Sequence, residues 1–408
     1  MERTLRAARL ATFAYFALNG FVLGMWIVHI PVVEHRAGIT HAVLGCLLLL
    51  LGGGAFAGMQ LVGPLTDRFG PRRVVPVSAA LCSAAVLLPG LATSGWTLGA
   101  ALLVLGFGNG CLDVSMNTHA VQVERGYGRP VMSAFHAVFS VGGVLAALVG
   151  ARTLSWGWSP AATLGTVSVC GLAVTALCAP ALLRPESAAP EAAPQTPAPV
   201  AAPAAARSRR TSPRIWALAA LALMLMLCEG VANDWSALDL RDVLDAPAAT
   251  AAFAYGAFST AMTAGRLLTD RVAGRFGPVA VVRYGAALAA LGLAAVVVAP
   301  WIPLALAGWT VFGTGLSGCI PQLFSAAGHA DQDAAGANVA RVAGLGYLGM
   351  LAGPAVIGAL TRLMPLNLAL LLPGVLCVTA AVASRVLRSE PAAGPELGQE
   401  ARREPVTR

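Results

Sequence analysis

The sequence predicts an all-α integral membrane protein with twelve transmembrane helices arranged as two pseudo-symmetric six-helix bundles. Three observations predict this fold. Of the 408 residues, 57% are hydrophobic and only 11% are charged, whereas soluble domains carry about 25% charged residues. The chain also divides into twelve mostly apolar stretches of about 20 residues, the length that crosses a bilayer as a helix. Finally, short motifs of the first half recur in the second half.

The apolar stretches form two sets of six. The first set lies near residues 9–31, 42–64, 74–92, 96–120, 131–152 and 160–182. The second set lies near residues 214–237, 250–270, 278–299, 301–325, 337–361 and 366–387. The first stretch follows a basic segment, as in a signal peptide, but it is long enough to span, so we expect an uncleaved first helix.

A stretch rich in Ala and Pro separates the two sets. Because such a composition cannot bury a core, we expect residues 184–213 to form a flexible cytoplasmic linker. Residues 389–408 have the same character and are expected to form a disordered cytoplasmic tail. The N-terminal six-helix bundle would then occupy residues 1–183 and the C-terminal bundle residues 214–388.

The distribution of arginine predicts the orientation in the membrane. The 27 basic residues are all arginine and lie mostly in short loops between apolar stretches, which indicates membrane orientation rather than nucleic-acid binding. With the N-terminus inside, the outer loops hold only Arg36, Arg152, Arg241 and Arg362. This bias predicts a multi-pass protein of the cytoplasmic (inner) cell membrane with both termini in the cytoplasm.

The repeated motifs are separated by about half the chain. The segment GPLTDR at 63–68 recurs as GRLLTDR at 265–271, and FGP at 69–71 recurs at 276–278. GFGNGC at 106–111 has a counterpart in GTGLSGC at 313–319, and Gly20 with Trp26 corresponds to Gly230 with Trp235. Parallel repeats of this kind are typical of transporters in which the substrate site lies between the halves near mid-membrane.

The segment GPLTDRFGPRR at 63–73 resembles the loop signature of the major facilitator superfamily, Gly-x-Leu-x-Asp-Arg-x-Gly-Arg-Lys/Arg. The resemblance extends over residues 8–388. NTHAVQVER at 117–125, MSAFH at 132–136 and the acidic segment 229–242 look like the uncharacterised bacterial permeases related to fucose permease. Drug antiporters of the superfamily carry an Arg early in helix four and a Gly-Pro motif in helix five, which residues 102–108 and 135–150 lack.

The resemblance implies a monomer in which helices one, four, seven and ten line a central cavity. In the loop signature, Gly63 would allow close helix approach and Gly70 a tight turn. Asp67 can accept hydrogen bonds from the N-terminus of a neighbouring helix, and the arginines can pair with acidic groups or lipid phosphates. We expect a latch that holds one alternating-access state, a topological anchor being the alternative. Its residues are Gly63, Asp67, Arg68, Gly70 and Arg72, with Asp270 and Arg271 in the second half.

Helix four carries the sharpest candidate for a binding site. Asn109, Asp113 and Asn117 recur every four residues and therefore share one helix face. A charged carboxylate at the centre of a bilayer costs about 2.5–3.5 kcal/mol, so this face is expected to line the bundle interior or a water-filled cavity. His136, about one turn into helix five, has a similar depth and could share or relay a proton with Asp113. A structural Asp–His contact is the alternative.

Helices seven and one add further polar groups. Glu229 and Asn233 share a face of helix seven, and a buried carboxylate suits a proton-coupling site. The nearby Asp234 and Asp239 belong to an acidic outer patch that we expect to be solvated. The substrate-binding candidates of helix one, able to bind a hydroxylated solute by hydrogen bonds and ring stacking, are Tyr15, Asn19 and Trp26. Trp26 is equally interpretable as an interfacial anchor.

These patterns predict a secondary active transporter that moves a small polar solute, sugar-like or a related metabolite, coupled to protons. The alternative is an exporter of a hydrophobic metabolite or drug by proton antiport. A sensor or membrane enzyme would need a catalytic cluster or a folded loop, and we find no such motif, so we expect no enzyme. No nucleotide-binding loop, metal site or cofactor is predicted. The expected partners are the solute, protons and membrane lipids.

Overall fold

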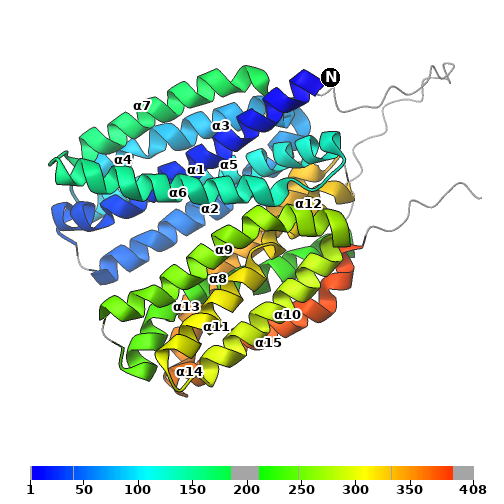
Figure 1. Cartoon of the computed structure of the whole chain (residues 1–408). Helices are drawn as coiled ribbons and strands as arrows, with labels where there is room; N and C mark the ends of the chain where they lie inside the picture. Colours follow the sequence, from blue (N-terminus) through cyan, green and yellow to red (C-terminus); the bar gives the residue numbers. More distant parts are fainter. Residues whose placement is uncertain (1, 40, 185–210, 247, 332, 389–408) are drawn as a thin grey trace, which may run out of the picture.

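The computed structural model describes residues 2–39, 41–184, 211–246, 248–331 and 333–388. All regular elements in these ranges are helices. Figure 1 shows the helices of the first half as one group and those of the second half as another beside it. The tail predicted for residues 389–408 and nearly all of the predicted linker lie outside the described residues.

Six spans make up the first half. They are formed by α1 (Glu2–Ala37), α2 (His41–Phe69), α3 (Pro71–Ala85) with α4 (Leu87–Leu91), α5 (Gly95–Tyr127), α6 (Met132–Ser155) and α7 (Pro160–Cys178) with the 3-10 turn η1 (Ala179–Ala181). Helices α3 and α4 together form one continuous span. Helices α1 and α5 are longer than a bilayer requires. Both extend beyond the apolar stretches from which the spans were predicted.

The second half repeats this order. Its elements are α8 (Pro213–Leu244), α9 (Ala248–Phe276), α10 (Pro278–Val297), α11 (Ile302–Leu316) with α12 (Cys319–Ala330), α13 (Ala335–Leu360), and α14 (Leu366–Ala369) with α15 (Leu371–Ala383) and the 3-10 turn η3 (Ser384–Leu387). The tenth span is thus broken between α11 and α12, at the glycine-rich motif that resembles the one in helix four.

Eleven of these helical segments in the described residues are long and apolar enough to cross a membrane. The twelfth segment is α9, a helix of 29 residues whose first half is rich in Ala and Thr and whose last half is charged. Its composition lowers its hydropathy, although its length and its place between α8 and α11 match the other spans. The predicted all-α fold of two pseudo-symmetric six-helix bundles is confirmed.

Two glycines turn the chain at equivalent places in the halves. Gly70, between α2 and α3, has φ +77°, and Gly277, between α9 and α10, has φ +83°. Both values lie in the region that L-residues with a side chain rarely adopt. A proline follows each glycine at the first position of the next helix, where its missing N–H is tolerated. The tight turn expected at Gly70 is therefore present.

Close helix packing also follows the repeat. A Cβ at Gly20 of α1 would lie 2.0 Å from the carbonyl oxygen of Phe139 in α6. A Cβ at Gly230 of α8 would lie 2.4 Å from the carbonyl oxygen of Met350 in α13. Each glycine thus lets the first and fifth helices of its bundle approach closely, as small residues do in membrane proteins.

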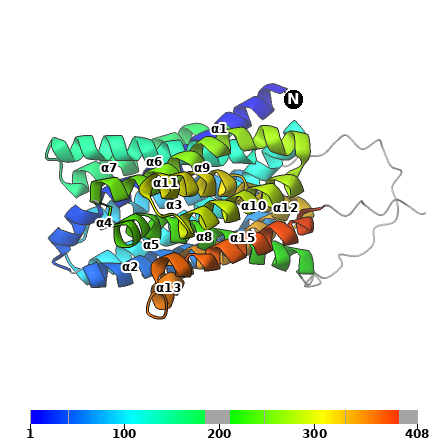
Figure 2. The same cartoon turned by 60° about the horizontal axis from the view of Figure 1, so that its bottom comes forward.

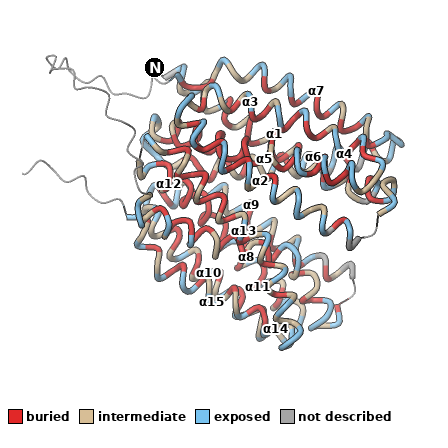
Figure 3. Tube along the Cα trace, turned by 180° about the vertical axis from the view of Figure 1, so that it is seen from behind, coloured by how far each residue is buried: buried red, intermediate tan, exposed pale blue. Residues whose placement is uncertain are grey.

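The helices begin and end at one of two ends of the molecule. We call the end that carries Gly70, Gly277 and the start of α1 the signature end, and the other the opposite end. In Figure 2 the helices lie side by side along one common direction between these ends. Figure 1 shows the two halves converging at the signature end and diverging toward the opposite end. Figure 3 shows that buried positions follow the interior helices, such as α5 and α8, while the outer faces are exposed.

Candidate functional site

The polar stripe of α5 lies buried between the halves. Asn109, Asp113 and Asn117 are exposed by only 4%, 6% and 0%. The Asn117 side-chain amide donates to the Asp113 carbonyl oxygen at 2.8 Å and to Asp113 Oδ1 at 3.3 Å. In the described residues, Asp113 Oδ2 and Asn109 Oδ1 have no hydrogen-bond partner. A buried polar atom without a partner is costly, so these two oxygens are free to bind a ligand or a proton.

His136 of α6 joins this stripe through Asn117. Its Nε2 lies 3.2 Å from Asn117 Oδ1, and its ring packs against Phe16 of α1 and Phe324 of α12. The direct Asp113–His136 contact considered from the sequence is replaced by a chain in which Asn117 lies between the two groups. The imidazole is held by side chains from both halves.

An ion pair joins two helices of the second half, α8 and α9. Arg266 Nη2 of α9 lies 3.5 Å from Glu229 Oε1 of α8, and the two side chains are only 13% and 16% exposed. Arg266 Nη1 also donates to Ser140 Oγ of α6 at 3.0 Å. Arg266 therefore neutralises Glu229 and links the second half to the first. From the sequence, Arg266 was considered only as part of the repeated motif. Its position inside a membrane span could have indicated a functional role, because charges there are rare and are usually paired.

Two further polar side chains come from helices of the second half that contact α5. Tyr347 of α13 lies beside Asn109 and near Asp113 and Glu229. Gln322 of α12 is 3% exposed, and its Nε2 has no hydrogen-bond partner in the described residues. Sequence reasoning missed both residues, because a lone Tyr or Gln inside an apolar stretch carries no periodic signal.

The other site residues predicted from the sequence lie apart from this group or on its margin. Tyr15 donates to the Thr175 carbonyl oxygen of α7 at 3.1 Å and is buried inside the first half. Asn19 and Trp26 are each 1% exposed, and Asn19 Oδ1 and Trp26 Nε1 have no partner in the described residues. The burial of Trp26 does not fit an interfacial anchor. Asn233 is exposed, one turn of α8 beyond Glu229 toward the opposite end.

One expectation for the opposite end was wrong. Asp239, expected in a solvated acidic patch, is 2% exposed and accepts a hydrogen bond from Trp309 Nε1 of α11 at 3.2 Å. The indole of α11 covers this carboxylate, which the sequence of α8 alone could not indicate. Asp234, Asp242 and Asp245 are exposed, as the solvated patch requires.

At the signature end, two aspartates cap helices of the opposite half. Asp67, near the end of α2, accepts hydrogen bonds from the backbone N–H groups of Gly336 and Ala337 at 2.6 and 2.9 Å. These amides belong to the first turn of α13, where a negative charge is favoured. The hydrogen bonds that the sequence led us to expect for Asp67 are therefore present.

Asp270, near the end of α9, makes the equivalent contact in the other direction. Its two carboxylate oxygens accept from the N–H groups of Ser133 at 2.9 Å and Ala134 at 2.7 Å, in the first turn of α6. We refer to the Asp67 and Asp270 contacts together as the paired caps. Each cap joins the end of one helix to the beginning of a helix in the other half.

The end of α5 adds a third connection. Glu124 accepts hydrogen bonds from the N–H groups of Val131 and Met132 at 2.9 and 3.0 Å, and from the Ser325 hydroxyl of α12. The neighbouring Arg125 donates to the carbonyl oxygen of Gly328. Hydrogen bonds between the halves thus gather at the signature end and at the level of Arg266, so this end of the molecule is closed.

In the part of the chain that the structure describes, Arg68 and Arg72 of the loop signature make their contacts within the first half. Arg72 donates to the carbonyl oxygens of Leu182 and Pro180 at 3.0 and 3.4 Å, so it caps the end of a helix in its own half. Arg68 lies over the ring of Phe69, 5.2 Å from its centroid. Arg271 is exposed. Gly63 permits the close contact between α2 and α13, because a Cβ there would lie 2.6 Å from the Ala340 Cβ.

Known proteins of similar sequence include two transporters and a further membrane protein. The chain is 33% identical over 376 residues to an uncharacterised MFS-type transporter of Yersinia pestis, covering 91% of this chain and 94% of that protein. It is also 33% identical over 375 residues to an uncharacterised transporter of Sinorhizobium fredii, covering 92% and 97%. A membrane protein of Rhizobium meliloti, MosC, is 29% identical over 356 residues, covering 87% and 84%.

Solved structures with the same fold agree with these relatives. The transporter FucP in its outward conformation matches with a TM-score of 0.73 at 16% identity, covering 93% of this chain and 98% of that one. The proton:xylose symporter XylE matches with a TM-score of 0.71 at 11% identity, covering 93% and 95%. The model of the Major Facilitator Superfamily matches residues 10–339 and 235–408. The chain therefore belongs to the Major Facilitator Superfamily and is a multi-pass membrane transporter, not an enzyme.

Proposed function

We propose that this protein is a secondary active transporter that moves a small polar, sugar-like solute together with a proton by alternating access. The proposal places the solute against the polar group between the halves and the proton on Asp113. It places the signature end in the cytoplasm, where the arginine bias of the loops would put it. The protein would act as a monomer, because the polar group draws on both halves of one chain.

The difference between the two buried carboxyl groups carries this proposal. Glu229 has a cationic partner in Arg266, whereas no ion pair is found for Asp113 among the described residues, and its Oδ2 has no hydrogen-bond partner. A buried carboxylate without a counter-charge is strongly disfavoured and is relieved by taking up a proton. Of the two carboxyl groups predicted to couple protons, Asp113 is therefore the proton carrier and Glu229 the partner of Arg266.

The polar character of the solute is supported by unpaired hydrogen-bonding atoms on α5 and on α12, which contacts α5. Among the residues that the structure describes, Asn109 Oδ1 has no donor and Gln322 Nε2 has no acceptor. A hydroxylated solute could satisfy both atoms, because each of its hydroxyl groups donates and accepts. Two proteins of the same fold, FucP and XylE, are described as a fucose:proton and a proton:xylose symporter.

Alternating access would proceed from the closed signature end. Opening that end must break the paired caps and the Arg266–Ser140 hydrogen bond, since these join the halves there. Movement of one charge through a membrane potential of 100 mV is worth about 2.3 kcal/mol. That free energy is comparable with one or two charge-assisted hydrogen bonds, so proton movement can bias the opening equilibrium.

The proposal is tested by solute-induced alkalinisation of lightly buffered cells that express the protein. Pools of sugars, polyols, organic acids and amino acids are added to wild type, Asp113→Asn and Asp234→Asn. Asp234 is an exposed carboxylate of α8, so its amide variant is the matched control. We expect one pool to raise the external pH with wild type and Asp234→Asn, and no pool to do so with Asp113→Asn.

Two outcomes would overturn the proposal. A response that persists in Asp113→Asn would show that Asp113 does not carry the transported proton. No response to any pool, with normal amounts of protein in the membrane, would contradict polar uptake and favour export of a hydrophobic compound.

A further inference from the structure

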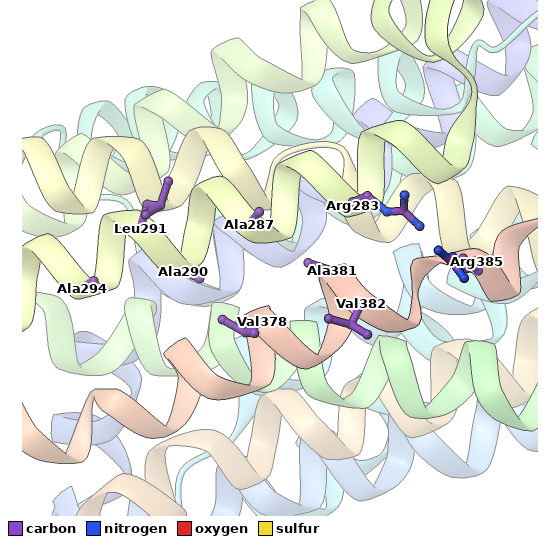
Figure 4. A pocket seen from close by; sticks show the side chains of 9 residues that line it. All are labelled: Arg283, Ala287, Ala290, Leu291, Ala294, Val378, Ala381, Val382 and Arg385. Atoms are coloured by element: carbon purple, nitrogen blue, oxygen red, sulfur yellow. The ribbon is translucent and has the colours of Figure 1, made fainter.

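A groove on the outer, membrane-facing side of the second half has the features of a lipid site. It lies between α10 and α15, has a volume of about 780 Å³ and is lined mainly by alanine, leucine and valine. Val378 and Val382 of α15 are 53% and 72% exposed. Figure 4 shows these two helices with the lining side chains along their junction. The floor of the groove on α10 is made of short side chains, so the two helices leave a hollow between them.

Two arginines stand at one end of this apolar groove. Arg283 comes from the second turn of α10 and Arg385 from η3, and both lie at the signature end. Figure 4 shows their guanidinium groups facing the same space. Arg283 Nε donates to Ser384 Oγ at 3.3 Å, which holds its side chain on the η3 side of the groove.

Neither arginine is used to cap or neutralise a neighbour in the described part of the chain. The carbonyl oxygens of Val386 and Leu387 accept hydrogen bonds from Arg214 instead. No ion pair is found for Arg283 or Arg385 among the described residues. Two guanidinium groups at the same end of the groove repel each other unless an anion lies between them. The planar guanidinium group can donate two parallel hydrogen bonds to phosphate oxygens.

The length of the groove fits one leaflet of a bilayer. Arg283 and Ala294 are eleven positions apart on α10, which corresponds to about 16 Å along the helix axis. The hydrocarbon core of a bilayer is about 30 Å thick, so one leaflet contributes about 15 Å. A phosphate bound at Arg283 would therefore lie at the interface while its acyl chains extend along the groove to Ala294.

We propose that this groove binds an anionic phospholipid of the leaflet at the signature end. The phosphate lies between Arg283 and Arg385, and the acyl chains pack along Ala287, Ala290 and Val378. The charge of the arginines selects the anionic headgroup, and the hollow over the alanines selects an acyl chain. This site is separate from the polar group around Asp113 and does not depend on the solute.

The test uses the full-length protein in nanodiscs that contain equal amounts of phosphatidylethanolamine and phosphatidylglycerol. After release into mild detergent, native mass spectrometry measures how much of each lipid stays bound. Near an anionic surface each arginine contributes about 1 kcal/mol, so Arg283→Gln with Arg385→Gln should lower phosphatidylglycerol retention about 30-fold. Phosphatidylethanolamine retention should be unchanged.

Two further variants separate a built site from surface charge. Arg129→Gln with Arg275→Gln removes the same charge from exposed positions of the signature end, and it should retain phosphatidylglycerol like wild type. Ala290→Phe fills the groove and keeps both arginines, and it should lose phosphatidylglycerol. Equal losses in the two double variants, no loss in the Arg283 and Arg385 double variant, or full retention in Ala290→Phe would each overturn the proposal.

Discussion

Asp67 and Asp270 make the same contact from opposite halves of the molecule. Each carboxylate, at the end of one helix, accepts two backbone hydrogen bonds from the first turn of a helix in the other half. The repeat visible in the sequence is therefore also a repeat of interactions. Because both caps lie at the signature end, they stabilise the state in which this end is closed.

Removing the charge of either cap should favour opening of the signature end. Asp67→Asn or Asp270→Asn replaces charge-assisted hydrogen bonds that contribute about 1.5–3 kcal/mol, so the population of the open state should rise by about tenfold or more. Distances between nitroxide labels at positions 129 and 275, in a variant without native cysteines, measure this change. Asp333→Asn, an exposed carboxylate near the start of α13, is the control and should leave the distances unchanged.

A side chain at Gly63 should open the same end by steric means. A Cβ there would lie 2.9 Å from the Gly336 carbonyl oxygen and 2.6 Å from the Ala340 Cβ, so Gly63→Val must push α2 away from α13. The same label pair should report longer distances. Gly53→Val places the same side chain where a Cβ would have no atom within 4 Å. Identical distance distributions for both variants would contradict the close-packing role of Gly63.

The Glu229–Arg266 pair should show strong energetic coupling. Glu229→Gln leaves the Arg266 cation without its partner, and Arg266→Gln leaves the carboxylate alone. Each single change should destabilise the protein by up to about 3 kcal/mol, because one buried charge is then unpaired. The double variant should be less destabilised than the sum of the two, as measured by thermal unfolding in detergent. Additive effects would indicate that the two side chains do not interact.

Trp309 should stabilise the second half through Asp239. Trp309→Phe keeps most of the ring but removes the indole N–H, leaving the buried Asp239 carboxylate without its donor. An unsatisfied buried acceptor costs about 1–3 kcal/mol, so the unfolding temperature should fall. Trp96, which is 93% exposed, offers the matched control: Trp96→Phe should unfold at the wild-type temperature.

The positions of the helices along the chain were easier to predict from the sequence than the neighbour that each helix face contacts. Tyr15 and Asn19, four residues apart, share one face of α1, because helical spacing is a local property that can be read from the sequence. Which neighbour that face meets depends on the packing of the whole bundle, and the Tyr15 hydroxyl bonds to α7. For α5, a stripe of three polar residues was sufficient to predict burial, since exposure to lipid would be too costly for all three.

Contacts between the halves were harder to foresee. Asp67 could be assigned to a helix N-terminus, because its motif and the charge preference of helix ends are visible in the sequence. The partner helix of Arg266 could not, since Ser140 and Glu229 lie 126 and 37 positions away along the chain. Such pairs are determined by how the two bundles dock, and a single sequence contains no direct record of that register.

The partner atoms of the paired caps are all backbone N–H groups. Replacing the side chain of Ala337, Ser133 or Ala134 leaves the N–H in place. Gly336 differs, because a Cβ there would lie 2.8 Å from Asp67 Oδ1 and 2.6 Å from the Gly63 carbonyl oxygen. Only proline removes the donor outright. The Asp67 cap is consequently sensitive to substitution on both of its helices, at the aspartate and at Gly336, whereas the two amides of the Asp270 cap can keep their N–H groups when their side chains change.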